Sequence, residues 1–105
     1  QPESDGGTDT APTPTELFIA SLASCVAFYA RRYLKRHGLP QGGLTITAEA
    51  ESGAKPSRIA SVTITLTLPE GVPEDKREAL LAVASHCTVH NTLTHPPEVL
   101  VQLAE

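Results

Sequence analysis

One long segment, which runs from Pro12 to Gly38, constrains the fold of this chain more than any other feature. At its start Thr13 is a candidate N-cap, Pro14 suits the first helical position, and Glu16 completes a capping box. At its end, "HGLP" supplies a glycine for the left-handed C-terminal position and a proline that prevents continuation. The segment therefore predicts a helix of about 24 residues, roughly 36 Å long, which is long for a small domain.

The segments that follow change period. Apolar residues alternate with Thr and Glu in "LTITAEA" (residues 44–50) and again in "ASVTITLTL" (60–68), which is typical of half-buried strands and predicts a hairpin. Acidic residues near Pro73 and a later apolar face predict a second helix that reaches about Leu93. The short apolar stretch Val99 to Leu103 predicts a last strand, and the polar residues 1–13 predict a loop.

This order of elements predicts an α+β fold in which a small antiparallel sheet covers the apolar faces of two helices. The chain has 105 residues and is 40% hydrophobic, which suits one domain over residues 1–105. An isolated hairpin is only marginally stable, so the sheet needs strands from elsewhere. We expect them to come from missing N-terminal sequence or from a second copy of the chain, that is, a homodimer.

Charge and hydropathy argue against two classes of partner. The net charge is −4, and the eight Lys and Arg residues form no basic stripe that could neutralise phosphates, so we expect no nucleic acid partner. No apolar run approaches the roughly 20 residues that span a bilayer, and the opening lacks the regions of a secretory signal. We therefore expect a soluble, cytoplasmic protein without membrane contact.

The two cysteines allow two interpretations. Cys25 and Cys87 each occupy an apolar-face position on one of the two predicted helices. Free Cys is among the most buried residue types and often only fills space. If the helices pack antiparallel, however, the sulfurs could meet as a redox pair, and a cytosolic pair of that kind is more often catalytic than structural. Both interpretations remain open on the sequence pattern.

A metal site is a third possibility to weigh. Four possible ligands lie within ten residues, with Cys25 as a fifth: His86, Cys87, His90 and His95. The Cys-x2-His spacing lacks the paired second half of a zinc site, and a histidine near a helix end is more often capping or solvated. No nucleophile elbow and no phosphate-binding glycine loop occurs in the sequence. We therefore expect neither a metal nor another cofactor.

Two blocks of sequence, "PTPTELFIASLASC" and "SHCTVHNTL", resemble the osmotically inducible protein C and organic hydroperoxide resistance family, OsmC/Ohr. The resemblance extends from about Gly6 to Leu103. It implies an α+β fold with two central helices packed against antiparallel sheet in an intertwined homodimer. The chain would then be a single OsmC-like domain without the N-terminal strands of the full family fold.

The resemblance also implies thiol peroxidase chemistry toward small organic hydroperoxides, as part of oxidative-stress defence. The Cys25 thiolate would attack the peroxide and become a sulfenic acid, Cys87 would condense with it to a disulfide, and a dithiol reductant would restore both thiols.

Two departures from the family pattern affect the other site residues. The Arg that assists the thiolate in the family has no counterpart in this chain, and the family's carboxylate falls one place later, at Glu16. Glu16 is thus either a site residue or only a helix cap, and Arg32 is either a substitute cation or a solvated surface residue. An alternative function is therefore a non-catalytic protein that binds a small apolar ligand in the dimer cleft.

Overall fold

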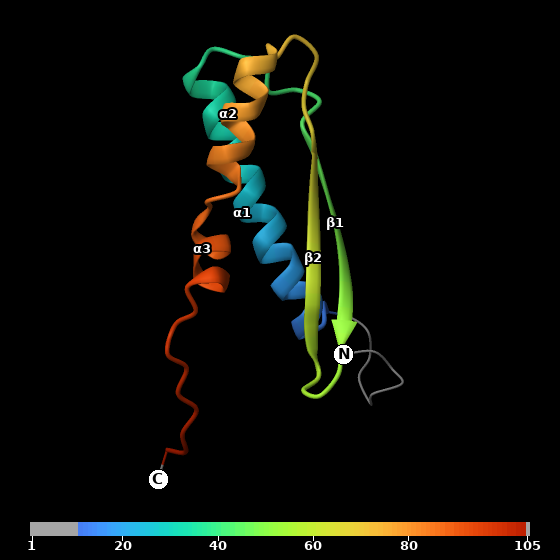
Figure 1. Cartoon of the computed structure of the whole chain (residues 1–105), viewed down its shortest axis with the longest axis vertical. Coiled ribbons are helices and arrows are strands. Elements are labelled where there is room, and N and C mark those ends of the chain that lie inside the picture. The colour runs from blue at the N-terminus through green and yellow to red at the C-terminus, as the bar shows by residue number, and fades with distance from the viewer. Residues whose placement is uncertain (1–10, 105) are drawn as a thin grey trace.

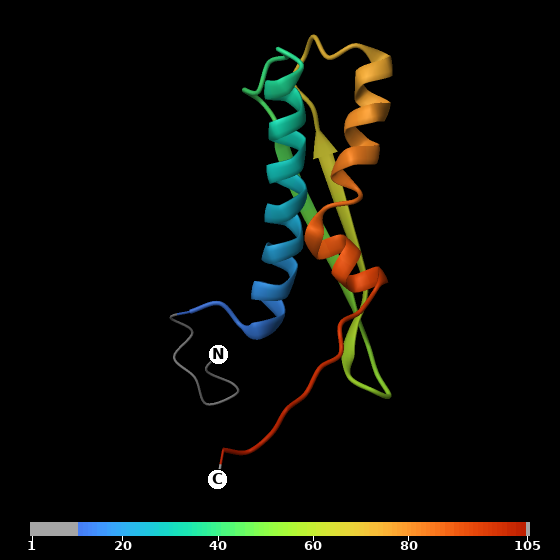
Figure 2. The same ribbon diagram turned by 90° about the vertical axis from the view of Figure 1, so that its left-hand side faces the viewer.

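The structure of the chain, a computed structural model, describes residues 11–104, so most of the loop predicted at 1–13 lies outside the described residues. In chain order the elements are α1 (Pro14–Arg36), β1 (Thr45–Gly53), β2 (Arg58–Thr67), α2 (Glu74–Ala84) and α3 (Thr88–Thr94). Figures 1 and 2 show two layers, with α1, α2 and α3 in one and the β1–β2 hairpin in the other. The predicted α+β class is confirmed.

Helix α1 begins and ends as the sequence predicts. The Thr13 hydroxyl accepts a hydrogen bond from the Glu16 amide at 3.1 Å, and the Thr13 amide donates to the Glu16 carboxylate at 2.8 Å, which completes the capping box. Gly38 takes a positive φ of 64° just beyond the helix, where a residue with a Cβ would be strained. One stripe of α1 is buried: Leu22, Val26, Ala30, Tyr33 and Leu34.

By length and composition alone, α1 could also cross a membrane, because one window of 18 residues reaches a mean hydropathy of 1.2. By helix length and mean hydropathy, the expectation that no apolar stretch is long enough to span a bilayer is therefore wrong. A core helix passes the same test, and the other helices and the hairpin pack on the buried stripe of α1.

The hairpin is amphipathic because its register places apolar residues opposite one another on one face. The antiparallel pairs on that face are Ile46↔Leu66, Ala48↔Ile64 and Ala50↔Val62. The β2 members of these pairs are partly buried against the core that α1 contributes. The opposite face is polar and rich in threonine, with Thr45↔Thr67, Thr47↔Thr65 and Glu49↔Thr63. One face of the sheet is thus suited to the core and the other to water.

The predicted second helix is wrong in its continuity, because it is broken between Ala84 and Thr88. Side chains near the break bond to the backbone and compete with the helix. The Ser85 hydroxyl donates to the Leu81 carbonyl at 2.6 Å, and the His86 Nδ1–H donates to the Ala82 carbonyl at 2.7 Å. Cys87 then caps a new helix, α3, so the second cysteine lies at a helix N-terminus and not within a helix.

The predicted last strand, Val99 to Leu103, is also wrong for the chain as described. This segment is irregular, and its side chains are exposed, with Val101 at 91% and Leu103 at 95%. Extended backbone needs a neighbouring strand for its hydrogen bonds, and within the described residues the only sheet consists of β1 and β2.

The core is small for a chain of this length. Among residues 11–104 it comprises nine buried hydrophobic residues, which come from α1, α2, the β2–α2 connection and the α2–α3 break. The radius of gyration is 17.1 Å, whereas a compact domain of 105 residues would have about 13 Å. The chain is therefore elongated, and much apolar surface stays uncovered, as the exposed side chains of Leu17, Leu81 and Val101 show.

The core predicts a marked contrast between two leucines of the same helix. Leu34 is fully buried, so Leu34→Ala should leave a cavity and lower the free energy of unfolding by about 2–5 kcal/mol. Leu17 is 56% exposed, so Leu17→Ala is the matched control and should change the free energy of unfolding by no more than about 0.5 kcal/mol. Urea unfolding at one fixed protein concentration measures both. Equal losses for the two variants would contradict the assignment of the core.

Candidate thiol site

The break between α2 and α3 brings the two cysteines together. Cys87 belongs to the buried core, and Cys25, near the middle of α1, packs against that core. The two thiols are close enough to influence one another, because the neighbouring Cys25 contributes to the raised pKa of Cys87. Both are free thiols. The structure thus places the sequence-predicted pair in one site.

The two thiols have different surroundings. The Cys87 side chain is 0% exposed, whereas Cys25 is half-buried. Burial raises the pKa of the Cys87 thiol, because the interior disfavours the charged form, and the neighbouring Cys25 raises it further. The backbone amides of His90 and Val89 act in the opposite direction but do not outweigh burial. Cys87 is therefore held as a neutral thiol, and Cys25 is the more exposed residue of the two.

The sulfur of Cys87 also has a structural task. It accepts a hydrogen bond from the His90 amide at 3.4 Å, as an N-cap side chain does, while the Cys87 carbonyl accepts one from the Asn91 amide at 2.9 Å. The Asn91 side chain donates to the His86 carbonyl at 3.1 Å and closes the turn between the helices. These contacts fix the position of Cys87 with respect to α3.

A hydrogen bond between helices holds the site together. The hydroxyls of Tyr29 and Thr88 share a hydrogen bond at 2.9 Å, which joins the residue one turn after Cys25 to the residue next to Cys87. Sequence reasoning missed this pair. Tyr29 lies on the same predicted helix face as Cys25, but no pattern in the sequence pairs it with Thr88, 59 positions away.

Glu16 takes the capping role and lies far from the thiols along α1. Hydrogen bonds from the Thr13 backbone and side chain lower the pKa of the exposed Glu16 carboxyl, which keeps it charged as a cap. Nine helical positions separate Glu16 from Cys25, about 13 Å along the axis. A role for Glu16 beside the thiol stays a prediction.

The histidines near Cys87 do not assemble into a metal centre. Within residues 11–104, no group of three His, Cys, Asp or Glu side chains could hold a metal ion. His86 uses its Nδ1 for the Ala82 carbonyl, and its ring centroid lies 6.1 Å from that of His90. The Nδ1 atom of His90 is buried and has no hydrogen-bond partner among the described residues.

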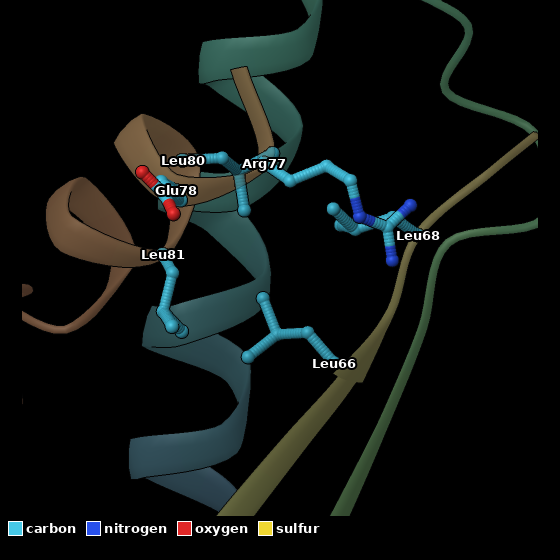
Figure 3. A pocket seen from close by; sticks show the side chains of 6 residues that line it. All are labelled: Leu66, Leu68, Arg77, Glu78, Leu80 and Leu81. Carbon is cyan, nitrogen blue, oxygen red and sulfur yellow. The ribbon is translucent and has the colours of Figure 1, made fainter. Parts of the chain in front are cut away.

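An open apolar groove runs beside the site, between β2 and the helices. The groove consists of three neighbouring hollows. The first and the second are both lined by Leu66 and Leu81. The second and the third are both lined by Leu22, Val62 and His90. Figure 3 shows the hollow between α2 and the end of β2, where leucines from both elements face one another and Arg77 extends toward Leu68. Neither cysteine is among the described residues that line these hollows.

Comparisons with known proteins agree with this architecture. The sequence model of the family described as OsmC-like protein matches residues 7–102. A crystal structure of a candidate osmotic stress induced and detoxification response protein from Psychrobacter arcticus 273-4 superposes with a TM-score of 0.79, at 24% identity, over 88% of this chain and 67% of that one.

A second similar structure comes from Legionella pneumophila. It is an organic hydroperoxide resistance protein OsmC, also described as a predicted redox protein and regulator of sulfide bond formation. The TM-score is 0.68 and the identity 25%, over 89% of this chain and 69% of that one. No match was found among curated proteins.

The contrast between the two sulfurs predicts the order in which they react. Iodoacetamide at pH 7 should alkylate the half-buried Cys25 first and the buried Cys87 only slowly, because alkylation needs an accessible thiolate. Mass spectrometry of the digested protein measures each site separately. In urea, which exposes both residues, the two rates should become similar. Faster alkylation of Cys87 than of Cys25 in the folded protein would refute the assignment.

Proposed function

The chain belongs to the family of OsmC-like proteins, and on that premise we propose that it is a cysteine-dependent thiol peroxidase that reduces organic hydroperoxides. The observation that carries the proposal is that the half-buried Cys25 packs against the same core that contains the buried thiol of Cys87, whose pKa it helps to raise. An accessible sulfur beside a protected one is the arrangement that a peroxidatic and a resolving cysteine require. The Legionella pneumophila relative, an organic hydroperoxide resistance protein, supports the choice of substrate.

In the first step, the Cys25 thiolate attacks one oxygen of the hydroperoxide. An S–O bond forms, the O–O bond breaks, and the alkoxide leaves and takes up a proton to become an alcohol. The sulfur is oxidised by two electrons to a sulfenic acid and the peroxide is reduced. The neutral Cys87 thiol beside it can donate a hydrogen bond to the Cys25 sulfur without introducing a second negative charge.

In the second step, Cys87 condenses with the sulfenic acid. The S–S bond forms, the S–O bond breaks, and the departing hydroxide takes the Cys87 proton to form water. A dithiol reductant then reduces the disulfide and becomes a disulfide itself. This cycle needs a reducing compartment, which is the basis for proposing a cytoplasmic location.

The apolar surroundings of Cys25 suit a substrate with an organic group. Phe28, one turn along α1, is 56% exposed, and its ring packs edge-on against Tyr29 with 5.7 Å between centroids. Exposed aromatic surface beside a reactive thiol favours an apolar hydroperoxide, which gains by burying its own surface there.

We propose that the functional form is a homodimer. The single chain leaves a groove open beside β2, and its last residues expose four large apolar side chains: Val99, Leu100, Val101 and Leu103. An elongated shape and an apolar segment without contacts are expected of a chain that packs against a second copy. The sequence supplies only two strands, and because an isolated hairpin is marginally stable, this shortage also favours a homodimer.

Replacement of each cysteine should give a different defect. Cys25→Ser should reduce turnover of cumene hydroperoxide with a dithiol reductant to the rate of free cysteine. Cys87→Ser should allow one oxidation and then trap Cys25 as sulfenic or sulfinic acid, because no thiol remains to condense with it. Peroxide consumption and the mass of the Cys25 peptide are the measurements.

A wild-type protein that consumes peroxide no faster than free cysteine would refute the proposed activity. The alternative, binding of a small apolar ligand in the dimer cleft, would then account for the fold. Ser is close in size to Cys, so the circular dichroism melting curves of both variants serve as the control for folding.

The dimer is tested at its apolar C-terminal segment. Val101→Asp should place a charge in the interface and shift the protein toward the chain mass of 11.1 kDa in light scattering at low micromolar concentration. Gln102→Asp, at the adjacent exposed position, is the matched control and should keep the dimer. A wild-type protein that is monomeric and stably folded would contradict the proposal.

A further inference from the structure

The hydroxyl of Tyr29 provides a polar link between α1 and α3. It shares a hydrogen bond of 2.9 Å with the Thr88 hydroxyl, and within residues 11–104 this is the only side-chain hydrogen bond between the two helices. Tyr29 follows Cys25 by four positions, which places both residues on the same face of α1, and Thr88 directly follows Cys87. The bond therefore closes a short path from one cysteine to the other.

Helix α3 has few other contacts that fix its position. Among the described elements only α1 packs on it, and an open hollow lined by residues of both elements lies between α3 and β2. The helix has seven residues, which is too short to persist alone. Val89 packs against the core and supplies an apolar contact. The bond between Thr88 and Tyr29 adds the direction that an apolar contact lacks.

The ring that carries this hydroxyl is itself held in place. The Arg32 guanidinium lies over the Tyr29 ring, 4.7 Å from its centroid, and Phe28 packs edge-on against the same ring at 5.7 Å. Both arrangements are attractive. Arg32 also lies over Phe28, 5.5 Å from the ring centroid, so its charge faces two aromatic rings. These neighbours limit the movement of Tyr29 and therefore of the hydroxyl that meets Thr88.

The position of α3 matters at one step of the proposed cycle. The Cys25 sulfenic acid can react with Cys87, in which case the S–S bond forms, the S–O bond breaks and water leaves. Alternatively, a second hydroperoxide transfers an oxygen to the same sulfur, which gives a sulfinic acid and an alcohol. A dithiol reverses only the first product. Which product forms depends on how well the Cys87 sulfur is held beside Cys25.

We propose that Tyr29 is a positioning residue that directs oxidised Cys25 to the disulfide and away from the sulfinic acid. The Cys87 sulfur gives up the hydrogen bond from the His90 amide when it reacts, so α3 loses its cap at that step. The bond between Tyr29 and Thr88 then keeps the start of α3 beside α1. The inference rests on the proposed function and deepens it, because it assigns the choice of product to a contact outside the thiol pair.

Thiol exchange with dithiodipyridine, an aromatic disulfide, tests this contact without peroxide. The Cys25 thiolate forms a mixed disulfide and releases one thiopyridone; Cys87 then attacks the Cys25 sulfur, forms the S–S bond and releases a second. Absorbance records both releases. Tyr29→Phe should slow the second release about fivefold, the factor that one hydrogen bond of ordinary strength supplies, and leave the first within about twofold.

The matched control is Tyr33→Phe, which removes the same atom from the same helix. Tyr33 lies in the core, one turn further along α1, and its ring stacks on that of His37 with 4.1 Å between centroids. Both releases should stay within about twofold of the wild type in this variant. All rates are compared well below the melting temperature of each variant, which circular dichroism gives.

Variants of Thr88 separate a positioning role from a general loss of stability. Thr88→Val should reproduce the slow second release, whereas Thr88→Ser, which keeps the hydroxyl, should retain the wild-type rate. The double variant Tyr29→Phe/Thr88→Val should be no slower than either single variant, because both changes remove the same bond. An unchanged second release in Tyr29→Phe, an equal loss in Tyr33→Phe, or losses that add in the double variant would overturn the proposal.

Cumene hydroperoxide connects the result to the cycle. In excess peroxide, the fraction of Cys25 that becomes sulfinic acid in each turnover should rise about fivefold in Tyr29→Phe, with the first oxidation unchanged. An unchanged fraction would overturn the role in the cycle. If the wild type forms the disulfide with dithiodipyridine but does not consume the peroxide, the peroxidase is refuted, and the second release still decides whether Tyr29 positions the pair. A wild type that forms no disulfide overturns both proposals.

Discussion

The end of α2 at Ala84 is the constraint on which the arrangement of this protein depends. If the helix continued, Cys87 would be one more position on its surface and α3 would not exist as a separate element. Because Ser85 and His86 bond to carbonyls of the preceding turn, the chain can bend there, and Cys87 enters the core beside α1. The bond between Tyr29 and Thr88 then fixes the angle at which α3 meets α1. The hydrogen bonds that end α2 and hold α3 against α1 therefore also position the two cysteines.

The sequence predicted α1, the hairpin and the class of fold, because each depends on local chemistry. Thr13 and Glu16 can form a capping box without help from the rest of the chain, and alternation in β1 and β2 places Ile46 and Leu66 on one face wherever the hairpin lies. The end of α2 could not be predicted in this way. No Gly or Pro marks it, and a cysteine is an unusual N-cap, so apolar periodicity carries on through the break.

The pairing of the cysteines was predicted only as one of two possibilities, and the reason is physical. Whether two helix-borne side chains meet depends on how the helices cross, which periodicity does not specify. The Tyr29–Thr88 contact depends on the same tertiary geometry. The prediction of a last strand was wrong for a different reason. Val99 to Leu103 has the composition of a strand but no neighbouring strand within the described chain.

In the proposed cycle, one atom, the sulfur of Cys87, has two tasks that compete. In the reduced protein it accepts the His90 amide and caps α3, a helix of seven residues, too short to persist without such support. Once that sulfur enters a bond to Cys25, its lone pairs and its position are set by the disulfide instead. Oxidation would then loosen the first turn of α3, and the redox state of the pair would change the order of a helix at the surface, where the proposed reductant would dock.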